Sequence, residues 1–66
     1  MHVWINGEQR ELADGASVRD ALAVLGAPQN GVAVAVDGEV VPRAEWPSAE
    51  LTDGARVEVL TAVQGG

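Results

Sequence analysis

Short stretches of the chain alternate apolar and polar residues, a pattern that predicts β-strands separated by turns. Residues 2–5 predict a first strand, with Val3 and Ile5 on one face and Trp4 on the other. Asn6-Gly7 is a strong signal for a two-residue hairpin turn. The stretch that follows, residues 8–12, is polar enough to favour the edge of a sheet. The chain therefore opens with a predicted β-hairpin.

A helical period replaces the alternation in the next stretch. Four apolar residues recur at the spacing i, i+3, i+4 and i+7: Val18, Ala21, Leu22 and Leu25. Ser17 is placed to cap this helix, and Asp20 stands three residues later, as in a capping box. Gly26 is typical of the residue that ends a helix, and Pro28 prevents continuation. We expect one short amphipathic helix whose apolar side lies on a sheet.

Three more strands are predicted after the helix. Residues 32–36 are apolar on both faces, which is typical of a strand with a neighbour on each side, and the valines of this stretch should face the helix. Asp37-Gly38 turns the chain into residues 39–41, and Asp53-Gly54 turns it into residues 56–63. Between these strands, Trp46 and Leu51 are expected in the core.

The order strand, strand, helix, strand, strand, strand predicts an α+β protein of the β-grasp, or ubiquitin-like, architecture. Its mixed five-stranded sheet would carry the one main helix on one face, with the first and last strands parallel at the centre. We assign residues 1–63 to this domain and residues 64–66 to a flexible tail that ends in Gly-Gly.

The sheet face that points away from the helix is the predicted binding surface. If Val57 and Val59 face the core, the alternation turns the intervening residues outward, where Ala33 would join them. An exposed apolar group that includes a tryptophan usually marks a contact site, although an ordinary half-exposed sheet would share the pattern. The predicted partner-binding residues are Trp4, Ala35, Glu58, Leu60 and Ala62.

Composition narrows the function classes. Ten acidic and four basic residues give a net charge of −6, which disfavours nucleic acid as a partner. The absence of cysteine excludes disulfides and a Cys-based zinc site, and a single histidine, His2, argues against any metal site. We expect no membrane span, because no stretch approaches about 20 apolar residues, and no leader, so a cytoplasmic protein is predicted.

Sequence motifs for catalysis are also missing. The glycines stand at turns rather than in a phosphate-binding loop, and no Ser/His/Asp spacing is present. Acidic pairs such as Glu8/Glu11 and Glu45/Glu50 are typical of a solvated face. We therefore expect no catalytic residue, no metal and no bound cofactor.

The chain resembles the thiamine-biosynthesis sulfur carrier proteins, the ThiS family, along its whole length. The resemblance rests on the opening strand with Asn6-Gly7, the helix entry Gly15-x-Ser17-Val18, the run AVDGEVVPRAEW over residues 35–46, and the stretch from Asp53-Gly54 through VEVLTAVQGG. Two departures are mild. Asp37 stands where Asn is common, and Trp4 is bulkier than the usual aliphatic residue.

The resemblance implies that the protein is a co-substrate rather than an enzyme. A ThiF-like adenylyltransferase would use ATP to activate the terminal carboxylate of Gly66, and sulfur would then replace AMP to give a thiocarboxylate. A ThiG-like thiazole synthase would consume that sulfur. Gln64 and Gly65 complete the tail, and a monomer is expected for the free carrier. Three alternatives stay open: a small subunit of molybdopterin synthase, a ubiquitin-like protein modifier joined to lysines, and a binding domain whose tail is incidental.

Overall fold

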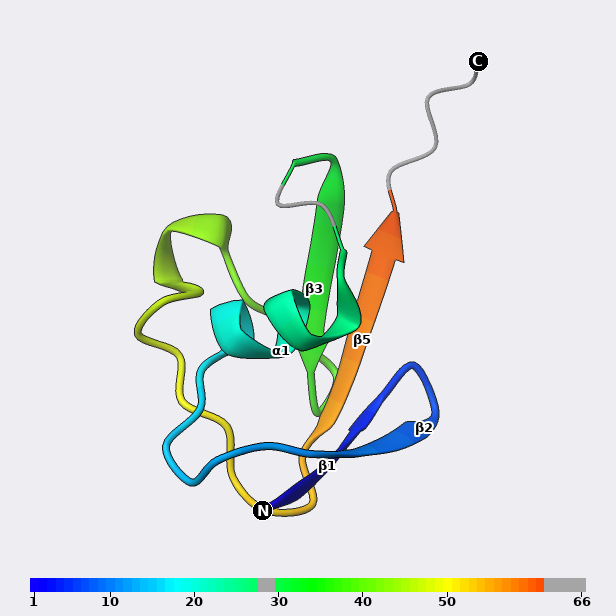
Figure 1. Ribbon diagram of the computed structural model, residues 1–66. Coiled ribbons are helices and arrows are strands. Elements are labelled where there is room, and N and C mark those ends of the chain that lie inside the picture. The colour runs from blue at the N-terminus through cyan, green and yellow to red at the C-terminus, as the bar shows by residue number, and fades with distance from the viewer. Residues whose placement is uncertain (28–29, 62–66) are drawn as a thin grey trace.

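The protein folds into a five-stranded sheet with one helix packed across one face, as seen in a computed structural model that describes residues 1–27 and 30–61 (Figure 1). The elements in chain order are β1 His2–Ile5, β2 Glu8–Glu11, α1 Val18–Leu25, β3 Val32–Val36, β4 Glu39–Val40, a 3-10 turn at Arg43–Glu45 and β5 Arg56–Thr61. The predicted elements are confirmed. β2 and β4 each end one residue before the predicted boundary, and residues 62 and 63 lie outside the described part.

The strand order across the sheet is β2-β1-β5-β3-β4. β1 runs parallel to β5, with Trp4 opposite Arg56 and Ile5 opposite Val57, while the other pairs are antiparallel. The predicted β-grasp arrangement is confirmed, with the first and last strands adjacent at the centre and the polar β2 at an edge. β3 has neighbours on both sides, as its apolar sequence predicts.

Helix α1 begins with the predicted capping box. The Ser17 hydroxyl accepts a hydrogen bond from the Asp20 backbone N–H at 3.3 Å, and the Asp20 carboxylate accepts one from the Ser17 N–H at 2.9 Å. These bonds satisfy donors that the first helical turn leaves without partners. Gly26 ends the helix in the left-handed conformation (φ 76°), which a residue without Cβ adopts without strain.

The core lies between α1 and the sheet. Leu22, at the centre of the helical stripe, is fully buried, and Val34 of β3 is 1% exposed. The buried apolar residues that form one cluster are Val3, Ile5, Leu12, Ala16, Val18, Ala21, Leu22, Val34, Trp46, Leu51, Ala55, Val57 and Val59. Leu25, Val32 and Val36 are partly buried against this cluster, so the predicted inward faces of the helix and of β3 are confirmed.

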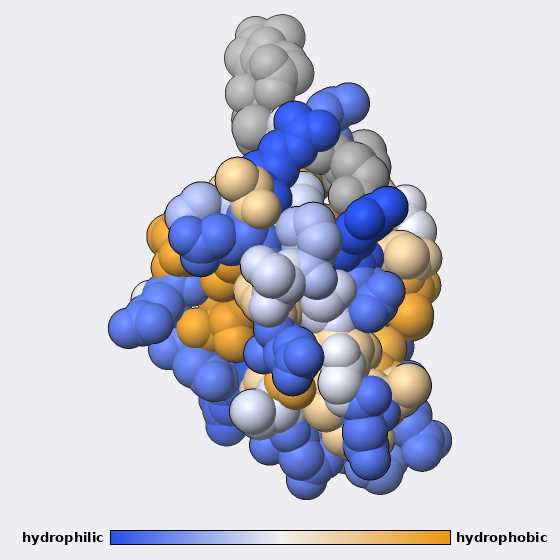
Figure 2. Space-filling model, turned by 90° about the vertical axis from the view of Figure 1, so that its left-hand side faces the viewer, coloured by the Kyte–Doolittle hydropathy of each residue, from blue (hydrophilic) through white to orange (hydrophobic). Residues whose placement is uncertain are grey.

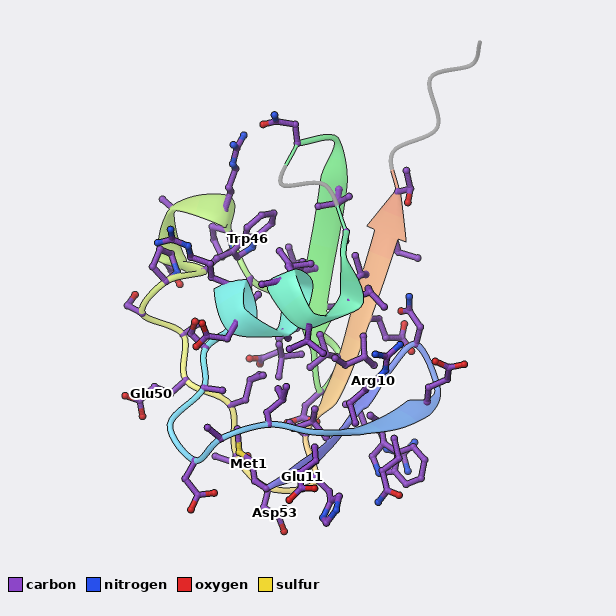
Figure 3. All side chains as sticks on the ribbon, in the orientation of Figure 1. Met1, Arg10, Glu11, Trp46, Glu50 and Asp53 are labelled. Atoms are coloured by element: carbon purple, nitrogen blue, oxygen red, sulfur yellow. The ribbon has the colours of Figure 1, made fainter. Side chains whose placement is uncertain are left out.

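Trp46 closes the core beside the 3-10 turn, as predicted. Its side chain lies between the loop after β4 and the rest of the fold (Figure 3), and the residue is only 3% exposed. The indole Nε1–H donates a hydrogen bond to the Val41 carbonyl at 2.9 Å, so its one polar group is satisfied. The loop that carries Trp46 is thus tied to the end of β4.

Hydrophilic side chains dominate the side of the molecule that Figure 2 displays, and the hydrophobic ones there form separate groups. The chain carries a net charge of −6, because its ten acidic residues outnumber its four basic ones. No helix within residues 1–27 and 30–61 is long and apolar enough to cross a membrane.

Candidate functional site

Strand β5 leads toward the residues that the sequence singles out for chemistry. Its inner residues Val57 and Val59 are 1% and 8% exposed, whereas Leu60 is 63% exposed and Glu58 also faces solvent. The predicted assignment of the two faces of this strand is therefore confirmed for the described residues. The remaining predicted positions, Ala62, Gln64, Gly65 and Gly66, lie outside the described residues.

An aspartate at the β3–β4 turn holds the start of β5. Asp37 has a positive φ of 51°, and its backbone N–H donates to the Arg56 carbonyl at 2.8 Å. Its carboxylate accepts a hydrogen bond from the Arg56 N–H at 3.0 Å. The residue thus bonds both backbone groups of Arg56. A carboxylate serves at this turn because the Arg56 N–H needs only an acceptor.

An asparagine at the β1–β2 turn holds β5 farther along. Asn6 also has φ 51°, and its backbone N–H donates to the Val57 carbonyl at 2.9 Å. Its side-chain Oδ1 accepts from the Val59 N–H at 2.8 Å, and its Nδ2 donates to the Val59 carbonyl at 3.3 Å. The local sequence predicts only a turn at Asn6. The Asn-Gly signal is explained by the turn itself, so nothing in the local sequence points to this second contact.

The outer sheet face is less uniformly apolar than the sequence suggests. Trp4 is 40% exposed and lies opposite Arg56 in the register, whereas Leu60 lies opposite Ala33. Arg56 and Leu60 are four residues apart on one strand, which corresponds to about 13 Å. Glu58 stands between them. Trp4 and Leu60 therefore belong to two separate apolar areas with charged side chains between them.

The apolar area around Leu60 is larger than predicted. Ala33 and Ala35 of β3 lie on this face, with Ala33 exposed and Ala35 half-buried. Val40 of β4 pairs with Ala35 and is 75% exposed, and it is not among the residues predicted for this surface. We define the Leu60 patch as Ala33, Ala35, Val40 and Leu60. The position of Val40 in a very short strand gave no alternation from which its direction could be predicted.

The area around Trp4 is hollowed. An open hollow of about 260 Å³ is lined by Trp4, Gly7, Arg56, Val57 and Glu58. It offers an aromatic face, one cation and one anion, which suits contact with polar side chains of another protein. We call this feature the Trp4 hollow. It adjoins the turn that carries Asn6.

The described residues show no grouping of side chains that could hold a metal ion. Within residues 1–27 and 30–61, no three His, Asp or Glu side chains are grouped so as to hold a metal ion. The backbone N–H of His2 donates to the Asp53 carboxylate at 2.8 Å, and Asp53 lies at the bottom of the molecule, near Met1 (Figure 3). Glu8 contacts Arg10 at 3.4 Å. The Asp53 and Glu8 carboxylates therefore make contacts within the fold.

A family model described as the ThiS family matches residues 3–66. The chain belongs to the ThiS family. The match extends over the five strands, the helix and the glycines at positions 65 and 66. The resemblance and the fold inferred from the sequence are thereby confirmed.

Relatives over the full length carry the same family name. The chain is 41% identical to the sulfur carrier protein ThiS of Thermus thermophilus, over 97% of this chain and 98% of that protein. It is 29% identical to the sulfur carrier protein ThiS of Escherichia coli, over the whole of both chains. ThiS proteins are thus named as sulfur carriers and not as catalysts.

Solved structures agree with this fold. The crystal structure of the thiamine biosynthesis protein ThiS from Geobacter metallireducens superposes with a TM-score of 0.83, at 30% identity and complete coverage of both chains. One further relative is a different kind of protein. The chain is 32% identical, over its whole length, to a segment that makes up 20% of a thiazole synthase from Paramagnetospirillum magneticum.

Proposed function

We propose that this ThiS-family protein carries sulfur for the thiazole part of thiamine as a thiocarboxylate on Gly66. The family match reaches residue 66 and is the observation that carries the proposal. The fold supports it, because β5 runs directly from the core toward the last residues. The carrier itself performs no catalysis in this scheme and binds no cofactor.

A carboxylate needs activation before sulfur can be added. An ionised carboxylate is a poor electrophile, so one of its oxygens first attacks the α-phosphate of ATP and releases pyrophosphate. The resulting acyl-adenylate has AMP as a good leaving group, and a sulfur nucleophile displaces it at the carbonyl carbon. The partner for this step is an adenylyltransferase of the ThiF type. Gly65 and Gly66 carry no Cβ, which allows a narrow channel to enclose the reacting end.

We propose thiazole synthase as the acceptor of the sulfur. The similarity to a segment of the Paramagnetospirillum magneticum thiazole synthase supports this pairing, because that segment and the rest of the synthase share one chain. Tethering of this kind raises the effective concentration of a carrier near its acceptor. For this protein, the same encounter would take place between separate chains.

We propose that the outer sheet face contacts the adenylyltransferase. The Leu60 patch and the Trp4 hollow are exposed and flank β5, so a partner that covers them lies beside the strand that leads to the tail. Tryptophan is enriched at binding hot spots, and the Leu60 patch offers a second exposed apolar area on the same face. The predicted contact residues Trp4, Ala35, Glu58 and Leu60 all lie on this face. Ala62 remains a prediction.

Intact mass spectrometry tests the proposal. The protein is incubated with a ThiF-type adenylyltransferase, ATP and a sulfide source, and a reaction without ATP is the control. Replacement of one carboxylate oxygen by sulfur should add about 16 Da to the chain, as expected for acyl transfer to sulfur. Addition of thiazole synthase and its small-molecule substrates should then return the original mass.

Three other results would contradict the proposal. A mass increase equal to a whole target protein would indicate a protein modifier joined to lysines. Loss of the added sulfur to a molybdopterin-synthase large subunit, but not to thiazole synthase, would place the carrier in another pathway. An unchanged mass in the complete reaction would reject the carrier function itself.

A further inference from the structure

The side chain of Asn6 replaces a missing part of the β1–β5 ladder. In a parallel pair, a residue of β1 donates to one residue of β5 and accepts from the residue two positions farther on. Asn6 donates its N–H to the Val57 carbonyl in this way. The chain then turns away at φ 51°, and the side-chain Oδ1 instead accepts the Val59 N–H at 2.8 Å. The amide thus continues the ladder beyond the end of β1.

The same side chain also satisfies the second backbone group of Val59. Its Nδ2 donates to the Val59 carbonyl at 3.3 Å, so both polar backbone groups of that residue are bonded. The asparagine amide offers a donor and an acceptor on one planar group, which matches the N–H and the carbonyl of Val59. Aspartate offers acceptors alone, and glycine offers neither. The turn would accept all three, because each tolerates a positive φ.

The end of β5 has little other support on this side. Among the described residues, β1 pairs with β5 at Arg56 and Val57 alone, while β3 pairs with β5 from Val57 to Thr61. The end of β5 and the beginning of β3 also extend past α1 toward the top of Figure 1. A two-stranded ribbon is marginally stable by itself. The bonds from Asn6 therefore brace the part of β5 that β1 does not reach.

We propose that Asn6 is a positioning residue for the transfer reaction, acting by fixing the direction in which β5 leads toward the tail. The inference rests on the proposed function. Seven residues separate Val59 from Gly66, a contour of at most about 25 Å. In a partner channel that holds the tail extended, a change of about 10° in the strand at Val59 would displace the reacting end by roughly 4 Å. Misplacement by about 1 Å is enough to slow a reaction that depends on orientation.

Asp37 provides a matched control. Asn6 and Asp37 share φ 51°, each precedes a glycine in a hairpin turn, and each bonds both backbone groups of one β5 residue. They differ in location, because Asp37 acts on Arg56 at the start of the strand. Asn6→Gly removes two side-chain hydrogen bonds to Val59, and Asp37→Gly removes one to Arg56 at the start of β5; both variants leave Gly-Gly turns.

The experiment compares adenylation kinetics of the two variants with those of the wild type, with the carrier as the varied substrate. Asn6→Gly should lower kcat by about tenfold and change KM by less than about twofold, because the outer sheet face that docks is intact. Asp37→Gly should keep kcat within about twofold of the wild type. Asn6→Asp retains the acceptor for the Val59 N–H and should recover part of the lost kcat.

Thermal melts of both glycine variants separate positioning from general stability. If the two variants lose similar stability and only Asn6→Gly loses kcat, the positioning role is supported. Equal losses of kcat in the two variants, or no loss in either, would overturn it. A rise in KM with unchanged kcat would also overturn it, since that result would place Asn6 in docking.

Amide hydrogen exchange keeps this inference separate from the proposed function. Asn6→Gly should accelerate exchange at Val59, which loses its acceptor, and at Leu60, which is paired with Ala33 of β3. Asp37→Gly should leave both amides unchanged. An unchanged exchange pattern in Asn6→Gly would overturn the bracing role alone. A wild-type carrier that is not adenylated would overturn the proposed function, whatever the exchange pattern.

Discussion

On β5, Val57 and Val59 are 1% and 8% exposed, whereas Leu60, the next residue along the strand, is 63% exposed. The inner residues pack against the core cluster beneath α1, and their apolar character is explained by the fold. Nothing in the described part of the chain covers Leu60 or Val40, which is 75% exposed. The inner face is therefore apolar for folding, whereas contacts among the described residues do not explain the exposed apolar side chains of the Leu60 patch.

Changes at the end of the chain should have the largest effect on function while leaving the fold intact. Deletion of Gly66 should abolish adenylation, because the tail would be one residue shorter and its carboxylate would not reach the reacting position in the partner's site. The free energy of unfolding should change by less than about 0.5 kcal/mol, since no described core residue lies beyond Val59. The measurements are the intact mass after the complete reaction and a urea melt.

Gly66→Val is the companion variant for the tail. It keeps the length and the carboxylate but adds a branched side chain, so adenylation should also fail if the channel is narrow. Adenylation of the deletion variant at the wild-type rate would contradict the assignment of Gly66. Unfolding of either variant would show that the tail contributes to the fold.

The inner side should be affected most by Leu22→Ala. Leu22 is fully buried at the centre of the α1 stripe, so its truncation should cost about 2–5 kcal/mol through lost apolar transfer and a cavity. A domain of this size has only about 3–5 kcal/mol to lose, and the variant should be largely unfolded at room temperature. A urea melt that follows tryptophan fluorescence measures the effect, with the buried Trp46 as the reporter.

Carrier activity of Leu22→Ala should fail only indirectly. Excess adenylyltransferase binds the folded form and should restore part of the adenylation by mass action. An unchanged urea midpoint would contradict the assignment of the α1 stripe to the core. A stable but inactive variant would show that Leu22 serves the partner rather than the fold.

On the outer side, Leu60→Glu should weaken partner binding and leave the stability nearly unchanged. The charge should weaken adenylyltransferase binding by about 1–3 kcal/mol, while stability should change by about 0.5 kcal/mol or less because Leu60 is exposed. Val24→Glu is the matched control, since Val24 is also an exposed apolar residue, at 49%, but lies on α1. Titration calorimetry of both variants with the adenylyltransferase gives the comparison.

Equal affinities of the Leu60→Glu and Val24→Glu variants would contradict a docking role for the Leu60 patch. Unfolding of the Leu60→Glu variant would mean that the Leu60 side chain is buried in the core and does not face solvent. Since Trp4 lies about 13 Å from Leu60 along the strand direction, its substitution should add to the effect independently. Strong coupling between the two positions would instead indicate one continuous contact.

The inner face could be predicted from the sequence because burial follows a simple period. Alternation placed Val57 and Val59 inward, and the helical spacing placed Leu22 inward; both assignments depend only on neighbouring residues. Local chemistry also sufficed for the cap formed by Ser17 and Asp20. The β-grasp topology then followed from the element order and the rules for connections.

Contacts between distant residues could not be predicted in the same way. Asn6 and Val59 are 53 positions apart, and the turn explained the asparagine without a second role. The interruption of the outer face by Arg56 depends on the β1–β5 register, which no local pattern specifies. The direction of Val40 was undetermined, because its strand is too short to show a period.

The capping box offers the smallest test, because it supports the inner face from its edge. Ser17 is 6% exposed, and its hydroxyl accepts the Asp20 N–H at 3.3 Å. Ser17→Ala should therefore cost about 1 kcal/mol, several times less than Leu22→Ala, since it removes a hydrogen bond but leaves the packing of α1 unchanged. Adenylation kinetics at room temperature should stay at the wild-type level, because most of the protein remains folded. Ser17→Thr keeps the hydroxyl and should recover most of the loss in a urea melt. A loss as large as that of Leu22→Ala would show that the start of α1, and not its apolar stripe, holds the helix on the sheet.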